Sequence, residues 1–454
     1  MKSPAPSSGS ESLPARSALR RLIGGTTALC IGLGVAIGSG IFRVPGDVAA
    51  QLGSPLPILA AWLVGGLITL AAGLVTAELA TRFPEAGGEY VFLREAYGRF
   101  WAFFFGWSYT IFVVGGGAAT IAVVIGEAGC QLLGWPRAWA TGISSAAIVA
   151  VATLNAIGLK VGARTQNVLS VLKVLVLLAV AALAMASSGP DAAPADVTSE
   201  PASAGFVLAF AVALRQVLWC YDGTTDSVKM AEEIRDVRRA LPRALIGSAV
   251  LLTAVYVGLN AAFLSAFSPR EMAASRFVAG DLVARALGPA GQRVMSAVTV
   301  VVCVGSLAST TLATIRVTFA LARDGLAFGG LARMSASQSP VNALAAVALI
   351  SVLFVNSGSF EQVLAIYSFA AAVLFSLAYG SLLVIRARDR RAGIDRRGVF
   401  ECPAGRAVAV MLIIVQAAVA AGSAWSHPRG AVGSLVLFAL VAVLYAAWRR
   451  RGAD

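Results

Sequence analysis

The sequence predicts an all-α integral membrane protein with about twelve transmembrane helices. Of its 454 residues, 58% are hydrophobic and only 13% are charged, whereas soluble domains carry about 25% charged residues. Apolar runs of about 20 residues, the length that crosses roughly 30 Å of hydrocarbon, recur from the first fifty residues to the C-terminal region. The polar intervals between these runs are too short for a water-soluble domain of ordinary size, so we expect a polytopic membrane protein.

The chain divides into a short tail, a ten-helix core and a C-terminal pair of helices. Residues 1–20, rich in Ser, Pro and Ala, predict a disordered cytoplasmic tail. Residues 21–388 form the expected core, and 389–454 hold a basic loop and two further helices. The expected spans are 22–51, 56–81, 100–129, 137–157, 166–187, 205–231, 243–267, 292–322, 341–357, 361–385, 406–425 and 431–448.

The net charge of +13 follows the predicted topology. Most of the 36 Lys and Arg residues fall on alternate segments between the spans, and those segments include both termini. Such a bias marks the cytoplasmic side of a membrane protein. We therefore expect an inner-membrane protein with both termini in the cytoplasm, and no nucleic-acid site.

The five cysteines are scattered and show no spacing typical of a metal site or a disulfide framework. We expect no metal and no cofactor. Cys130, at the outer end of a span, is the one cysteine placed to reach another chain. A homodimer is left open. The five are Cys30, Cys130, Cys220, Cys303 and Cys402.

Two spans are broken near their middle. The first holds four glycines within nine residues, from Gly32 to Gly40, and the sixth holds the polar run Trp219–Asp226. Broken helices at matching positions of two halves indicate an inverted-repeat transporter with its site near the membrane midplane. We expect five-plus-five inverted repeats at about 21–187 and 205–388.

Unwound backbone in a membrane must be satisfied, and a bound zwitterion can satisfy it. The half-helix that resumes at Gly40 exposes unpaired N–H groups and the positive end of its dipole, which suits a carboxylate. Ser39 adds a hydroxyl. Carbonyls freed around Trp219 and Cys220 would face an ammonium, and Asp222 either approaches that ammonium or caps the break. Alternatively, the glycines are close-packing points between helices.

Four motifs occur in order over about the first 340 residues. They lie in the first span, in the second span and the loop after it, after the sixth span, and after the eighth. They read Ile37-Gly38-Ser39-Gly40-Ile41-Phe42 with Pro45; Ala77-Glu78-Leu79 with Pro84, Gly87-Gly88, Tyr90 and Gly98; Ala231-Glu232-Glu233 with Leu241-Pro242; and Arg323-Asp324-Gly325.

This ordered set resembles the amino acid–polyamine–organocation superfamily, and most of all the bacterial relatives of the L-type amino acid transporters. The resemblance implies that spans 1, 2, 6 and 7 form a bundle that rocks against a scaffold. It also places the substrate carboxylate on the first break, the amine on the sixth-span carbonyls of Trp219 and Asp222, and an aromatic gate at Trp219. Family members in animals pair with a glycoprotein subunit, which is not expected here because only Cys130 would support one. The implied carboxylate group is Gly38, Ser39, Gly40 and Ile41; the amine and gate group is Ala36, Trp219, Cys220, Asp222 and Gly223.

Lys173 is a charge inside the fifth span, and such charges are functional hypotheses by default. Its ammonium needs acceptors, for which first-helix carbonyls near Ala36 together with Ser306 and Thr310 are expected. The resemblance implies that Lys173 replaces the ion that sodium-coupled relatives bind there, and a lowered pKa could couple it to protons. The alternative is a lysine that snorkels to the inner surface.

These features predict a secondary transporter of L-amino acids that works by sodium-independent exchange or proton-coupled symport. A cationic amine or polyamine exchanger is an alternative that requires acidic residues, for which Asp222 is the obvious candidate. A sensor on a transporter scaffold would carry a sizeable soluble output domain. An enzyme is not expected, because no nucleophile–base pair, metal cluster or phosphate loop stands out.

Overall fold

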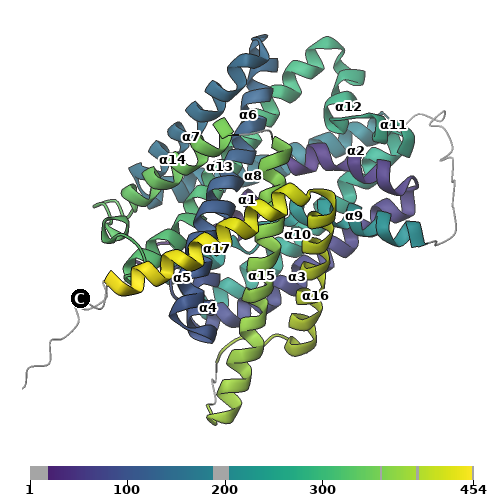
Figure 1. Cartoon of the computed structure of the whole chain (residues 1–454). Coiled ribbons are helices and arrows are strands. Elements are labelled where there is room, and N and C mark those ends of the chain that lie inside the picture. Colours follow the sequence, from purple (N-terminus) through teal and green to yellow (C-terminus); the bar gives the residue numbers. More distant parts are fainter. Residues whose placement is uncertain (1–18, 188–203, 358–359, 395–397, 452–454) are drawn as a thin grey trace, which may run out of the picture.

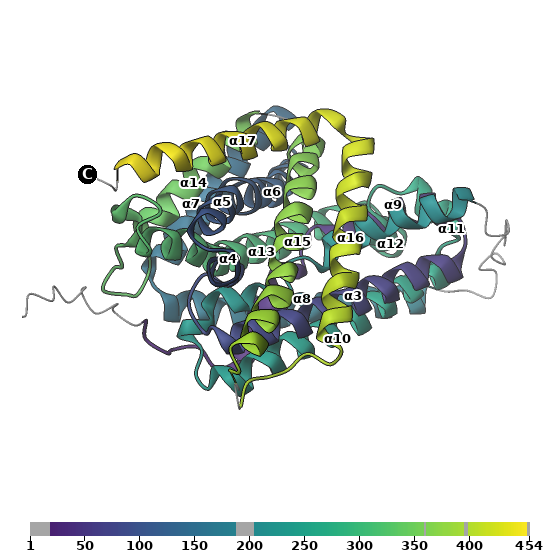
Figure 2. The ribbon, with the colours of Figure 1, turned by 60° about the horizontal axis from the view of Figure 1, so that its bottom comes forward.

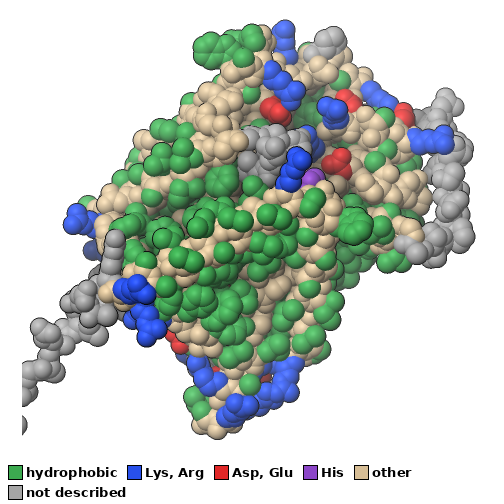
Figure 3. Space-filling model, viewed as in Figure 1, with side chains coloured by type: hydrophobic (Ala, Val, Ile, Leu, Met, Phe, Trp, Pro, Cys, Tyr) green, Lys and Arg blue, Asp and Glu red, His purple; other side chains and the backbone are tan. Residues whose placement is uncertain are grey.

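The computed structural model describes residues 19–187, 204–357, 360–394 and 398–451. Most of the predicted tail, residues 1–18, lies outside this part of the chain. The regular elements of the described residues are helices. In addition, Ile23 and Ile234 form one isolated β-bridge. Long helices cross the molecule at different tilts, and a green belt of hydrophobic side chains covers the middle of one face (Figures 1 and 3).

The helices occupy the twelve predicted positions. Within the described residues, ten segments are long and apolar enough to cross a membrane, and the bent pair α1 (Gly25–Ala36) and α2 (Gly40–Leu52) makes eleven. The ninth predicted span is α14 (Val341–Ser357), a shorter apolar helix. The ten are α3 (Pro55–Arg82), α5 to α6 (Arg99–Leu133), η2 with α7 (Arg137–Ile157), α8 (Leu159–Ala186), α9 (Ala204–Tyr221) with η3 (Asp226–Glu233), α10 (Val237–Ala266), α13 (Pro289–Arg323), α15 (Phe360–Arg391), α16 (Gly405–Ser426) and α17 (Pro428–Arg451).

Side-chain exposure shows why these helices need a bilayer. Large apolar residues such as Val171 and Leu175 on α8, or Val443 and Leu444 on α17, are more than half exposed. On a water-soluble protein such continuous apolar faces would be covered. In lipid the same faces cost nothing, so the exposed positions of α8 and α17 identify the surface that meets hydrocarbon.

Two groups of helices surround the breaks. In the first, α3 packs along α10, α1 packs on α10, and α9 contacts both α2 and α3. In the second, α6 packs against α7 and α13, and α14 packs against α7 (Figure 1). The α8 helix contacts α1, α10 and α13, while α15 carries α16 and α17 on its outer side (Figure 2). Predicted spans 1, 2, 6 and 7 therefore do pack together as a bundle.

The third span contains a feature with no sequence signal. Between α5 (Arg99–Ser108) and α6 (Gly117–Leu133) the backbone winds as a π-helix, η1 (Tyr109–Gly116). Such segments are rare and concentrate at functional sites. This one faces the breaks, as described below.

The two ends of the helical layer carry different elements. One end, called the basic face below, carries Arg82, Arg94, Arg323 and Arg386 and includes the short helix α4 (Glu89–Tyr97). The opposite face carries η2 (Arg137–Trp139), α11 (Pro269–Ala274) and α12 (Val278–Leu287).

Candidate functional site at the two broken helices

The first break is a three-residue interruption with a 50° bend between α1 and α2. The last helical bond of α1 runs from the N–H of Ile37 to the carbonyl of Leu33, at 2.8 Å. The helix resumes at Gly40, and the Ser39 side chain makes no capping bond to any described residue. The first N–H groups of α2 therefore face the space beside Gly38, Ser39 and Gly40, as predicted for a helix start.

The second break separates α9 from the 3-10 helix η3. After Tyr221 the chain turns through Asp222–Thr225, and the N–H of Asp226 donates to Gly223 O at 2.9 Å. Gly223 has φ of +86°, a left-handed conformation that other residues adopt at a cost. The predicted break in the sixth span is confirmed.

The two breaks pack directly against each other through glycines. A Cβ added to Gly40 would lie 2.9 Å from Cys220 Sγ, and one added to Gly223 would lie 2.1 Å from Val35 Cγ1. A Cβ on Gly32 would lie 2.5 Å from the carbonyl oxygen of Thr224. Gly40 therefore serves both as a packing point and as part of the site, whereas Gly32 serves only for packing.

A tyrosine that the sequence did not single out joins the breaks. The hydroxyl of Tyr256, on α10, lies 3.1 Å from Ala36 O and 3.2 Å from Cys220 O. These two carbonyls, expected to be free for an ammonium, share the single proton of this hydroxyl, and each keeps a lone pair that can accept. The carbonyl of Trp219 likewise accepts the N–H of Asp222, at 3.3 Å.

Lys173 is buried behind the first break, with 1% of its surface exposed. Its Nζ donates to Gly34 O at 2.7 Å, to Ile37 O at 2.9 Å and to Ser306 Oγ at 2.8 Å. An ammonium has three donors, and all three are used. The snorkelling alternative is wrong for this structure, and the expected acceptors on the first helix and Ser306 are correct.

Thr310 lies elsewhere than expected. It is not an acceptor for Lys173; its buried hydroxyl has no hydrogen-bond partner among the described residues. One helical turn separates it from Ser306, a shift of roughly 6 Å along α13. Thr310 instead lines the cavity between the breaks.

That cavity, of about 80 Å³, is bounded by both breaks, by η1 and by α13. Asp222 stands at its edge, held by the N–H of Gly223 at 2.8 Å and by the hydroxyl of Tyr367. Ile41 is fully buried outside the lining, so only its N–H could serve a ligand. The lining residues are Val35, Ala36, Gly38, Ser39, Gly40, Tyr109, Val113, Gly117, Thr120, Ile121, Trp219, Cys220, Asp222, Gly223, Asp226, Thr310, Thr314 and Tyr367.

A larger cavity of about 420 Å³ begins at Ser39 and extends toward the face opposite the basic face. Three arginines line it, Arg43, Arg137 and Arg276, together with Glu127. Arg137 and Glu127 form an exposed ion pair at 2.8 Å. This vestibule therefore carries a positive balance of charge.

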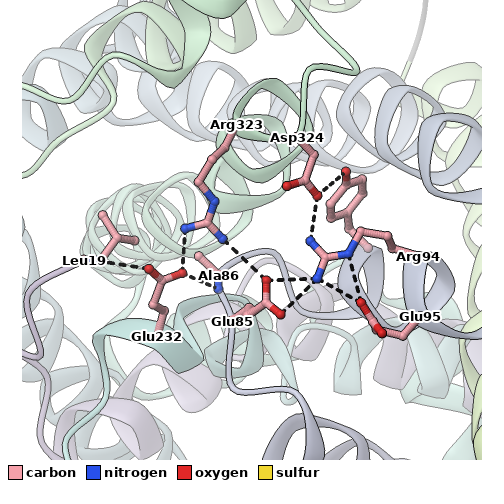
Figure 4. Close-up of polar contacts among 9 residues, drawn as sticks. Leu19, Glu85, Ala86, Arg94, Glu95, Glu232, Arg323 and Asp324 are labelled. Carbon is pink, nitrogen blue, oxygen red and sulfur yellow. Dashed lines mark hydrogen bonds and ion pairs between the residues drawn. The ribbon is translucent and has the colours of Figure 1, made fainter. Parts of the chain in front are cut away.

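On the basic face, ion pairs tie the two helix groups together (Figure 4). Arg323, at the end of α13, binds Glu232 of η3 at 2.8 Å, and Glu232 also accepts the N–H groups of Leu19 and Ala86. Arg94 of α4 joins Glu85 at 2.9 Å and Asp324 at 2.7 Å. Deeper in the protein, Arg316 binds both carboxylate oxygens of Glu233, at 3.2 and 3.0 Å. These contacts join η3 and α4 to the C-terminal end of α13 and to Asp324, which follows it.

The comparisons agree with this geometry. Residues 23–447 match the family model described as amino acid permease. The chain is 30% identical to the serine/threonine exchanger SteT of Bacillus subtilis over 82% of this chain and 85% of that protein. It is 27% identical to the b(0,+)-type amino acid transporter 1 of Mus musculus over 82% of this chain and 77% of that protein. An uncharacterized transporter of Mycobacterium tuberculosis is 28% identical over 89% of both chains. The chain therefore belongs to the amino acid permease family.

Proposed function

We propose that this protein moves L-amino acids across a membrane by alternating access, without sodium. The observation that carries this is a cavity with an uncapped helix start on one side and a carboxylate on the other. An α-amino acid has the complementary charges at one fixed spacing. The names of the relatives, an exchanger for serine and threonine and a b(0,+)-type amino acid transporter, support the same activity.

The carboxylate is held by the start of α2. The N–H groups of Ser39, Gly40 and Ile41 lead into the first turn, where no described side chain caps them. The dipole of a 13-residue helix adds about half a positive charge at this end. The absence of a side chain at Gly38 and Gly40 lets the ligand approach the backbone.

The amine lies toward the second break. Asp222 offers a carboxylate at the cavity edge, positioned by Tyr367 and by the N–H of Gly223. Trp219 packs against Gly40 and lines the cavity, so it can close over a bound ligand. The carbonyls of Ala36 and Cys220 share the one proton of Tyr256 and keep lone pairs that can accept from the amine beside Asp222.

Lys173 acts as a fixed positive charge. An ammonium has three donors, and the three oxygens within 2.9 Å of Nζ can accept all of them. In this role Lys173 holds the first break open and occupies the position where sodium-coupled relatives of the fold bind their ion.

In each half of the core, a side chain of the last span binds the broken first span, which supports inverted repeats at about 21–187 and 205–388. Lys173, in the fifth span, secures the break in the first. Tyr367, in the tenth span, secures the break in the sixth through Asp222. We place the basic face in the cytoplasm, following the distribution of Lys and Arg, and the vestibule on the outside.

The vestibule favours zwitterions over polyamines. Arg137 is paired with Glu127, and Arg43 interacts with Asp47, which leaves the charge of Arg276 to repel cations and attract a carboxylate. Cys130 is buried, with its Sγ 3.5 Å from the carbonyl of Pro136, so it is not placed to bind an accessory subunit.

Transport in proteoliposomes tests this function. Vesicles loaded with unlabelled serine and placed in sodium-free buffer should accumulate labelled serine, and putrescine should not compete. Gly40→Leu should abolish uptake and binding, because its side chain would meet Cys220 and Trp219. Gly258→Leu is the matched control, since a Cβ at that lipid-facing glycine meets no described atom within 4 Å. Full serine affinity in folded Gly40→Leu protein would refute the carboxylate site.

A further inference from the structure

A buried cluster of three charged side chains lies between the cavity and the basic face. Lys229 of η3 has its Nζ 2.5 Å from Asp226 Oδ1 and 3.3 Å from Glu89 Oε2. The Nζ also lies 5.2 Å from the centre of the Tyr109 ring. Lys229 is fully buried, Glu89 is 3% exposed and Asp226 is 5% exposed. Water therefore does not screen these charges.

The charges of this cluster do not balance. One ammonium faces two carboxylates, and a surplus charge is unfavourable in a low-dielectric interior. Asp226 is the closer partner of Lys229, and the short distance between their charged atoms is that of an ion pair. Glu89 contacts the same ammonium at longer range: Lys229 Nζ donates to its Oε1 at 3.4 Å, and its Oε2 has no hydrogen-bond partner among the described residues. Glu89 is therefore the more weakly paired of the two carboxylates.

Other charged groups near the cavity do not supply the missing positive charge. Arg316 is bound through two contacts to Glu233, and Arg323 to Glu232. Lys173 is committed to the first break. The remaining titratable side chains that face Glu89 are Tyr109 of η1 and Tyr379 of α15, which are neutral at physiological pH.

We propose that Glu89 carries a proton in this conformation and is the site that couples amino acid transport to a proton gradient. This rests on the proposed transport function. Burial raises the pKa of the Glu89 carboxyl above its usual value, and the negative charge of Asp226 acts in the same direction, while Lys229 opposes both. A neutral carboxyl satisfies the charge balance of the cluster.

The position of Glu89 links the proton to the transport cycle. Asp226 lines the cavity, so the cluster touches the substrate site on one side. Glu89 begins α4, whose Tyr90 and Arg94 bind Asp324 among the ion pairs of the basic face. If these ion pairs separate during the transport cycle, water reaches Glu89, and solvation of the charged form lowers its pKa. The O–H bond of the carboxyl then breaks and a water oxygen accepts the proton, with no change of oxidation state.

The test is proton movement in proteoliposomes that contain a pH-sensitive dye. In the wild-type protein, external serine should acidify the lumen, and one inward pH unit should support up to about tenfold accumulation at one proton per amino acid. Glu89→Gln, which mimics the protonated form, should keep serine counterflow within about threefold while losing both proton effects. Glu95→Gln is the matched control, because Glu95 lies on the same helix with 30% of its side chain exposed.

Two results would overturn the proposal. The first is accumulation of serine by Glu89→Gln in response to a pH gradient, and the second is serine exchange by the wild-type protein without proton movement. If wild-type protein shows no serine exchange at all, the proposed transport function itself fails. If Glu89→Gln does not fold, Glu89→Asp decides: the shorter carboxylate should retain coupling with a shifted pH midpoint, and an unchanged pH profile would contradict the assignment.

Discussion

Replacing Lys173 by methionine tests whether the ammonium holds the first break in shape. Methionine keeps the length and apolar character of the lysine stem, so the packing around α8 changes little. It removes all three donors to Gly34 O, Ile37 O and Ser306 Oγ. The hydroxyl of Ser306 keeps its 2.6 Å bond to Ile37 O, but its contact with Gly34 O is 3.3 Å long.

The expected loss follows from this arrangement. One buried carbonyl, that of Gly34, loses its short donor, which costs about 1–3 kcal/mol. Because the break presents the N–H groups of α2, a loss of about 2 kcal/mol from the binding-competent shape should weaken serine binding roughly thirtyfold. Thermal unfolding with and without serine measures both quantities. Val171→Met, on the lipid-exposed side of the same helix, should change neither.

A double-mutant cycle with Gly305 checks the pose of the lysine itself. A Cβ at Gly305 would lie 2.8 Å from Lys173 Cε, so Gly305→Ala should destabilise the wild-type protein. The same change should be harmless when Lys173→Ala has removed the stem. Additive effects of the two changes would show that Lys173 does not lie against α13, and the reasoning above would be wrong.

Three further outcomes are expected in detergent-solubilised protein. Arg316→Met leaves the carboxylate of Glu233 buried without a partner and should cost about 3–5 kcal/mol, measured by thermal unfolding; adding Glu233→Gln should restore most of it, and a purely additive pair would contradict the assignment. Gly223→Ala, at a positive φ, should cost about 1–2 kcal/mol or more, whereas Gly258→Ala should not lower the melting temperature. Tyr256→Phe removes the donor shared by both breaks and should cost about 1–3 kcal/mol, with a larger loss of serine affinity than of stability.

The spans and both breaks could be predicted because the bilayer acts on local sequence. An apolar run has to reach about 20 residues to cross, and a cluster of glycines or polar residues inside it weakens the helix at that point. The π-helix η1 could not be predicted, because Tyr109–Gly116 reads as an ordinary apolar run. Its winding depends on what packs against it.

The site was predicted only where one segment determines it. The N–H groups beside Ser39 follow from the helix start, but the satisfaction of Ala36 and Cys220 depends on Tyr256, a residue of another span. Similarly, Ser306 and Thr310 share a helix face, yet only Ser306 reaches Lys173. Which end of that face meets the ammonium is set by how α13 crosses α8, and no local pattern carries that information.

The start of α2 has a consequence for how such a chain diversifies. The donors of the proposed carboxylate site are backbone N–H groups, and every residue except proline supplies the same donor. Substitutions elsewhere than at the close-packed Gly40 would leave these donors in place. Preference among amino acids is left to replaceable side chains such as Val113, Ile121 and Thr310 on the far wall. Substitutions at these positions can change which amino acids are bound, while the backbone groups that bind the carboxylate stay the same.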